Sequence, residues 1–385
     1  MNLINKYFNI KNHSEYNGLA DEINVLLIKE YYENNNENIL ILTNTIYEAN
    51  KLFERLKNYI ELVFLFPMDD FITDMILASS PELKIKRLET LSNISNHNHV
   101  IVITNLYGYI HKLPSIKEAN SKFKIFINKE IKRNEIINTL DNYGYTRSSI
   151  VTTTGEYALR GFIIDVFPIG EEHPIRIELF GDLIDSIRIF DENTQLSVKD
   201  INEYEIKPFS EIKTESHNSL YDYLYNPLTI VFDKEQIKVS FLKLQNDIIS
   251  YKEEKNEDIT YEIYDLADIK PKKEIKFNTL NDKESDVLSH NIDNFNSNFD
   301  LIKNYVEKNI YQNKTVIFCL SNDKQIEKIK DEFVNAIIIS DIDGYEINKI
   351  NICKYKINNG FIINDLVVIS DNDIEKTTHS NIKYK

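Results

Sequence analysis

The chain has 385 residues, and its 61 acidic side chains against 45 lysines and arginines give a formal net charge of −16. Tight binding of nucleic acid depends on basic side chains that neutralise phosphates, so we do not expect this chain to hold DNA strongly by itself. Its length predicts about two to four domains. No apolar run approaches the ~20 residues that cross a bilayer, and the first residues lack the apolar core of a secretory signal, which favours a cytoplasmic protein without a membrane segment.

The first 119 residues show the pattern of a parallel α/β domain. Residues 39–43 and 100–104 are short apolar runs, as expected for strands that are buried on both faces. Between them, residues 47–59 repeat apolar side chains at helical spacing. Ser80 as an N-cap and Pro81 in the first turn predict the start of a further helix.

Residues 120–206 carry the clearest signal of an antiparallel unit. The chain has only nine glycines, and five of them fall between Gly144 and Gly181, where each is expected to mark backbone that needs glycine. Gly181 and Asp182 predict a turn after the strand 175–180. A three-residue loop through Leu183 would give three cross-strand pairs: Ile177 with Ile187, Ile175 with Ile189, and Arg176 with Arg188.

One face of this predicted hairpin has an unusual composition. Strand periodicity places Arg176, Glu178 and Phe180 opposite the apolar face, towards solvent. Aromatic and arginine side chains together are typical of a protein-binding hot spot. Single exposed aromatics are also common on solvated surfaces, so this face is either a partner-binding surface or an ordinary solvated one.

The second half of the chain predicts a further α/β unit. Residues 252–298 are acidic and polar and are expected to be partly a linker, and a helix is predicted from Phe299 to about residue 308. Apolar runs at 315–318, 336–339 and 366–369 predict strands. Cys319 and Cys353 lack the spacing of a zinc or disulfide framework, so we expect two buried apolar side chains.

Two other polar groups have the composition of a metal site without its full pattern. His97 and His99 have the spacing of ligands, but no third ligand accompanies them. Asp69, Asp70 and Asp74 follow a predicted strand, where a solvated loop is the favoured interpretation. We expect no metal in this chain.

Several motifs together resemble one family. The quoted segments are Gly155-Glu156-Tyr157-x-x-Arg160-Gly161, Asp165-x-Phe167-Pro168, Pro174-x-Arg176-x-Glu178-x-Phe180 and Asp185-Ser186-Ile187-Arg188-x-Phe190-Asp191. They closely resemble the second domain of the transcription-repair coupling factors, which is itself similar to the damage-recognition subunit UvrB. Residues 66–70, 80–83 and 87–91 resemble the first domain of that family. Residues 360–369 resemble the segment just before its RNA-polymerase-interacting domain.

This resemblance implies a multidomain α/β fold. A degenerate P-loop-ATPase-like parallel α/β domain is expected to hold an inserted small α+β antiparallel domain like domain 2 of UvrB, with a second small α/β domain after it. The expected segments are 1–119 for the first part of the ATPase-like domain, 120–206 for the inserted domain, 207–292 for the second part and a linker, 293–376 for the small α/β domain and 377–385 for a tail.

A phosphate-binding loop needs several glycines and a lysine that reaches the phosphates. The chain contains no Gly-Lys dipeptide, and residues 16–22 stand in the expected place with one glycine and with the acids Asp21 and Glu22. Residues 366–370 with Asp371 imitate the strand and acid of a magnesium site, but are interpreted as a core strand that leads into a loop. We therefore expect a nucleotide-free relative of an ATPase domain, without a cofactor.

The resemblance implies that this chain is a non-catalytic module that binds the repair subunit UvrA. The UvrA-contacting residues of the family match Arg160, Arg176 and Phe180, and the strand face adds Glu178 and Arg188. In the intact family protein, motor domains with ATP and Mg²⁺ translocate on double-stranded DNA and displace stalled RNA polymerase. Two alternatives stay open: an active UvrB-like helicase-type repair enzyme, and a structural spacer without a binding face.

Overall fold

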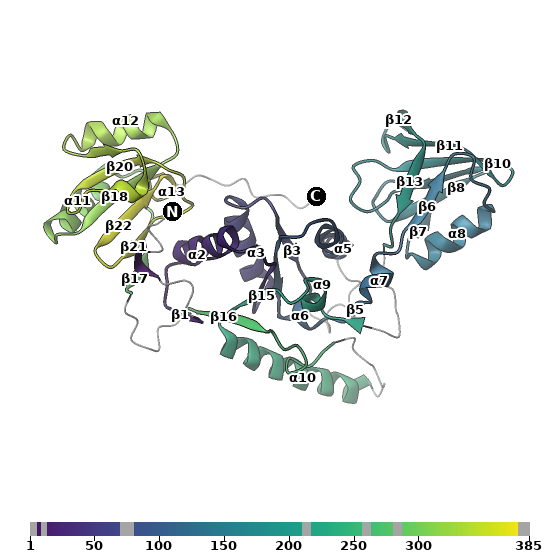
Figure 1. Cartoon of the computed structure of the whole chain (residues 1–385), viewed down its shortest axis with the longest axis horizontal. Coiled ribbons are helices and arrows are strands. Elements are labelled where there is room, and N and C mark those ends of the chain that lie inside the picture. The colour runs from purple at the N-terminus through teal and green to yellow at the C-terminus, as the bar shows by residue number, and fades with distance from the viewer. Residues whose placement is uncertain are drawn as a thin grey trace.

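The computed structural model describes residues 6–8, 14–69, 81–209, 217–255, 263–279 and 287–375. Ser80, Asp70, Asp74 and the predicted tail at 377–385 lie outside these residues. The described residues contain three six-stranded sheets, which lie in three lobes along the longest axis of the molecule (Figure 1). The predicted multidomain α/β class is therefore confirmed, while the predicted segment limits stay predictions. Among the described helices, none combines the length and apolar character needed to cross a membrane.

The central lobe is built on a fully parallel sheet. Its strands in spatial order are β1 (Glu15–Asn17), β16 (Lys273–Asn278), β15 (Leu228–Phe232), β2 (Ile39–Thr43), β4 (Ile101–Asn105) and β3 (Val63–Phe66). Alternate residues of β2 enter two different apolar cores, Ile39 and Ile41 in one and Leu40 and Leu42 in the other. Both faces of the sheet are therefore buried, which explains why its strands are continuous apolar runs.

Helices cover this sheet, and the chain enters it twice. The helices of this lobe are α2 (Asp21–Asn34), α3 (Ile46–Lys57), α5 (Pro81–Asn96), α6 (Leu106–Ile110), α9 (Leu220–Tyr223) and α10 (Lys234–Lys255). The chain leaves the sheet after β4 and returns with β15, so the second lobe is an insertion. The sequence patterns had indicated neither α10 nor the strands β15 and β16. The last of these strands lies inside the interval expected to be partly a linker.

The second lobe is a mainly antiparallel sheet with α8 (Arg133–Asn142) packed against it. Its strands in spatial order are β12 (Ser197–Ile201), β11 (Leu183–Phe190), β10 (Ile175–Phe180), β9 (Ile163–Val166), β8 (Glu156–Arg160) and β7 (Thr146–Ser148). Only β7 and β8 run parallel within this sheet. Smaller pairs are formed by β6 (Phe123–Phe126) with β13 (Glu203–Ile206), and by β5 (Leu113–Pro114) with β14 (His217–Asn218), while α7 (Ile116–Ala119) joins the lobes.

The predicted register of the β10–β11 hairpin is confirmed. Ile175 pairs with Ile189, Ile177 with Ile187, and Arg176 with Arg188. The predicted three-residue loop is wrong, because the turn contains only Gly181 and Asp182. A β-bulge, where Glu178 pairs with Ser186 but Leu179 pairs with Ile184, supplies the extra residue and restores the apolar alignment.

The third lobe is a mixed sheet of its own. Its strands in spatial order are β17 (Ser289–Asn291), β21 (Phe361–Ile363), β22 (Leu366–Ser370), β18 (Thr315–Leu320), β20 (Ile350–Lys354) and β19 (Ile337–Ile339), with α11 (Phe299–Tyr311), α12 (Asp323–Glu332) and α13 (Asp371–Ile374). The loop expected after β22 is instead α13, because Ser370 and Asp373 form a capping box. Cys319 and Cys353 are both buried, as expected, and lie opposite one another on β18 and β20.

The central and third lobes share one apolar core. Ile23 and Ile28 of α2 belong to the same buried cluster as Cys319, Phe361 and Val368 of the third sheet. This cluster joins segments that lie at opposite ends of the sequence. The two lobes are thereby packed against each other along α2.

Candidate partner-binding surface and the amino end of α2

Arg176 and Asp165 form the central ion pair of the second lobe. Arg176 Nε donates to Asp165 Oδ1 at 2.7 Å, and Arg176 Nη2 donates to Asp165 Oδ2 at 2.8 Å. Asp165 is fully buried, and the guanidinium lies 4.2 Å from the centre of the Phe190 ring. The hydrogen bonds from this guanidinium to Asp165 raise the pKa of Arg176. The prediction that Arg176 simply faces solvent is therefore wrong, because most of its donors are already bonded within the sheet.

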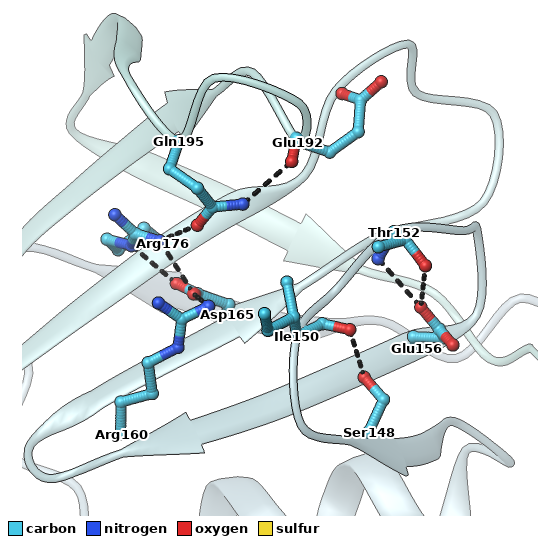
Figure 2. A network of polar contacts seen from close by, with 9 residues as sticks. All are labelled: Ser148, Ile150, Thr152, Glu156, Arg160, Asp165, Arg176, Glu192 and Gln195. Atoms are coloured by element: carbon cyan, nitrogen blue, oxygen red, sulfur yellow. Dashed lines mark hydrogen bonds and ion pairs between the residues drawn. The ribbon is translucent and has the colours of Figure 1, made fainter.

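Arg160 approaches the same carboxylate from the neighbouring strand. Its Nη2 lies 4.0 Å from Asp165 Oδ2, and its side chain is 42% exposed. Figure 2 shows Arg160 and Arg176 both directed at Asp165. One buried acid is thus flanked by two arginines, and Arg160 is the one that keeps donors available to a partner.

Phe180 is the most exposed of the predicted binding residues, at 79%. It ends β10, directly before the turn at Gly181, whose φ of 64° is in the left-handed region. The strand fixes the backbone of Phe180, while its ring belongs to no apolar core of the described residues. An aromatic ring presented in this way is available for burial against another protein.

Glu178 and Arg188 form a second ion pair on the same face, and both side chains are partly exposed. Ser186 Oγ also donates to Glu178 at 2.9 Å. Partial burial alone would raise the pKa of Glu178, but the hydrogen bonds from Ser186 and Arg188 outweigh it and lower that pKa. The like charges of Arg176 and Arg188 are therefore tolerated as a cross-strand pair because each has its own carboxylate.

The network continues beyond Arg176 to the next turn. Gln195 accepts from Arg176 at 3.0 Å and donates to the carbonyl of Glu192 at 2.9 Å, as seen in Figure 2.

His173, Asp191 and Glu192 have ligand atoms within 4.8 Å of one another. Such a group could hold a divalent cation, and the sequence spacing did not indicate it. One oxygen of Asp191 already accepts bonds from Asn193 and Thr194, so local structure accounts for its place.

The amino end of α2, where the resemblance led us to look for a phosphate-binding loop, is occupied by the third lobe. Ala20 N donates to Ser289 Oγ at 2.8 Å, and Asp21 N donates to Asn291 Oδ1 at 3.0 Å. Free N–H groups at this end of a helix are what binds phosphate in nucleotide-binding proteins. Two of these groups are taken up here by side chains of β17.

The two acids that open α2 have different partners. Asp21 forms ion pairs with Lys51 at 3.0 Å and Arg55 at 3.1 Å. Glu22 is fully buried, where it accepts from the Tyr59 hydroxyl and from Asn358 N at 3.0 Å. Burial raises the pKa of Glu22 above its ordinary value. Both acids thus serve to join helices and lobes.

A strand-and-acid pattern of the kind assigned to Asp371 occurs in the central sheet as well. The apolar strand β15 ends directly before Asp233, which accepts hydrogen bonds from the backbone and side chain of Thr279. A cavity of about 210 Å³ lies beside them, at the carboxyl ends of β2, β15 and β16. Ligands of parallel α/β sheets commonly bind at this edge. The run 228–232 followed by Asp233 was the sequence signal that would have located this cavity.

The histidines and the acid that the sequence analysis weighed as metal ligands have different surroundings. His97 Nδ1 lies 3.0 Å from the carbonyl of Asn93, whereas the His99 ring stacks on Tyr32. Asp69 is the one acid of the predicted loop group that lies among the described residues.

Comparison with known proteins gives this architecture a class. Residues 123–211 match the family described as the UvrB interaction domain. This segment contains Arg160, Arg176 and Phe180. The chain is 36% identical over 228 residues to the transcription-repair-coupling factor of Staphylococcus aureus strain bovine RF122 / ET3-1. These aligned residues make up 58% of this chain and 18% of that protein. It is 30% identical over 198 residues to the factor of Bacillus subtilis strain 168, which covers 51% of this chain and 17% of that protein.

The chain is thus an α/β protein with an inserted UvrB interaction domain. Its sequence resembles an N-terminal region of the transcription-repair-coupling factors. The chain spans less than a fifth of the length of these curated relatives.

Proposed function

We propose that this chain is a non-catalytic recruitment module that binds UvrA in transcription-coupled nucleotide-excision repair. The observation that carries this proposal is the exposed pair of Arg160 and Phe180 on a sheet whose strands are held together by the buried ion pair of Arg176 and Asp165. Arginine can bond a partner carboxylate in two places, and the aromatic ring supplies apolar area. Arg176 contributes by holding Asp165 and thereby the face of the sheet, with Glu178 and Arg188 beside it.

The amino end of α2 supports the non-catalytic part of the proposal. Its first N–H groups are bonded to Ser289 and Asn291, and the acids Asp21 and Glu22 stand where a lysine and glycines would be needed. No nucleotide or metal is required for the binding role. ATP, Mg²⁺, RNA polymerase and double-stranded DNA belong, in this proposal, to motor and polymerase-binding domains of the intact factor, which acts in the cytoplasm.

A direct test is calorimetric titration of UvrA into the purified chain and its variants. Arg160→Ala and Phe180→Ala should each weaken binding, while the exposed Leu196, beyond the opposite end of β10 and β11, provides the control Leu196→Ala. Equal affinities for all three variants would leave the structural-spacer interpretation. ATP turnover by the unmodified chain would instead favour the helicase-type enzyme.

A further inference from the structure

Two turns of the second lobe lie at the same edge of its sheet, and an exposed phenylalanine lies within the first and directly before the second. Gly161 and Phe162 connect β8 to β9, while Gly181 and Asp182 connect β10 to β11. Leu179 N donates to the carbonyl of Phe162 at 2.9 Å, which brings the first turn next to the end of β10. Phe180 stands at that end, so the two aromatic residues occupy adjacent positions along the edge.

The exposure of Phe162 is not explained by the fold. Its side chain is 65% exposed, and it belongs to no apolar core among the described residues. Gly161 already supplies the left-handed backbone of the turn, with a φ of 58°. A polar residue would therefore serve the turn equally well, as Asp182 does in the neighbouring turn.

The edge also has further apolar surface and a charge. Leu183 pairs with Phe180 across the hairpin and is 36% exposed. Arg160 directly precedes Gly161 and is partly exposed. Single exposed apolar residues are ordinary, whereas several on one edge beside an arginine mark an interaction site.

We propose that Phe162 is a second aromatic anchor for UvrA, so that the binding surface extends from Arg160 across Phe162 to Phe180 and Leu183. This inference rests on the function proposed above. The matching surface of the partner would be an apolar segment that lies across the edge, with a carboxylate placed to reach Arg160. Continuity with Arg160 and Phe180 is what identifies the occupant, because Phe162 lies between them along the edge.

The test measures UvrA affinity by calorimetry for the full chain and for Phe162→Ala, Phe180→Ala and Leu196→Ala, together with the thermal midpoint and the mass of each variant. Loss of a hot-spot aromatic commonly weakens binding by roughly tenfold or more, which is the result expected for Phe162→Ala. The control Leu196→Ala should stay within about twofold of the original chain. The thermal midpoints should all agree, because these side chains lie outside the core.

The outcomes separate the two proposals. If the unmodified chain does not bind UvrA, the proposed function fails and this inference fails with it. If Phe180→Ala weakens binding and Phe162→Ala does not, only this inference is overturned. It is also overturned if Phe162→Ala lowers the thermal midpoint, or if its sole effect is to dissociate a dimer, since the edge would then serve folding or self-association. Phe162→Leu should recover part of the lost affinity if the partner binds the apolar area of this side chain.

Discussion

Arg176 and Asp165 lie directly opposite one another on β10 and β9, and the arginine neutralises an acid that has no exposure to solvent. The family resemblance groups Arg176 with Arg160 and Phe180, but the three side chains have different surroundings. Arg176 is bonded to Asp165 and Gln195, whereas Arg160 is partly exposed and Phe180 is largely exposed. Arg176 therefore holds the sheet, and the proposed binding groups are those of the other two residues.

Arg176→Ala should destabilise the protein by about 2–3 kcal/mol, since it leaves a buried carboxylate without its main partner. Arg160→Ala should cost less than about 0.5 kcal/mol, because its longer contact with Asp165 is partly exposed. Urea unfolding of both variants measures the difference. The double variant Arg176→Ala, Asp165→Asn should recover stability relative to Arg176→Ala alone. A single Arg176→Ala variant as stable as the original chain would show that the pair does not support the fold.

Phe180→Ala separates binding from folding. Removal of this exposed ring should weaken UvrA binding by about thirtyfold, on the order of 2 kcal/mol, and change unfolding free energy by no more than about 0.5 kcal/mol. Titration calorimetry and thermal melting of the same preparation give both values. A parallel loss of stability and affinity would place the ring in the folded core instead of the binding surface.

The β10–β11 hairpin shows which structural features a local sequence pattern can predict. Alternation of apolar residues from 175 to 180 was sufficient for the register, but not for the bulge at Glu178 and Leu179 that makes a two-residue turn compatible with it. Alternation also placed Arg176 opposite the apolar face correctly, but it did not predict that this side chain is largely buried. Its partner could not be found in the same way, because Asp165 lies in the third strand position of an otherwise apolar run on β9. A polar residue within such a run was the available signal of a buried ion pair.

Long-range contacts were the main feature that the sequence did not predict. The acids Asp21 and Glu22 were recognised as unsuited to phosphate, but their partners Lys51, Tyr59 and Asn358 come from distant segments. Likewise β15 and β16 complete the central sheet after an inserted domain. Periodicity describes one element at a time, so it carries no information about which elements meet in space.

Ser289→Ala tests the contact between the third lobe and α2. The substitution leaves the buried N–H of Ala20 without its acceptor and should cost about 1–2 kcal/mol. Millimolar ATP with Mg²⁺ should leave the thermal midpoint of the original chain unchanged, because a ligand stabilises only the state that binds it. A rise in the midpoint on adding ATP would contradict the assignment of α2 as a structural helix. The exposed Ser149, in the second lobe, offers Ser149→Ala as a control for the substitution itself.

Gly155 and Gly161 make a matched pair for the backbone. Both have positive φ, 88° and 58°, but a Cβ on Gly155 would lie 2.3 Å from the Phe209 ring, whereas nothing lies within 4 Å of that position at Gly161. Gly161→Ala should therefore cost only about 1–2 kcal/mol of left-handed strain. Gly155→Ala should cost clearly more, because the buried ring must also move. Equal unfolding free energies for the two variants would show that Phe209 adjusts freely.

Glu22→Gln should make stability less dependent on pH. Burial raises the pKa of Glu22 in the folded protein above that of the unfolded chain, which is about 4.3. For such a group the stabilising contribution is complete below the unfolded pKa and is lost as the pH rises through the folded pKa. Glutamine does not titrate, and its amide oxygen can still accept from Tyr59 and Asn358. The unfolding free energy of Glu22→Gln relative to the original chain should therefore increase between about pH 4 and pH 7. Urea unfolding across this range measures this difference in free energy.

Tyr59→Phe removes a hydrogen bond that favours the ionised acid, so it should move the pH-dependent loss of stability to higher pH. A constant difference between Glu22→Gln and the original chain would mean that Glu22 keeps its ordinary pKa when buried.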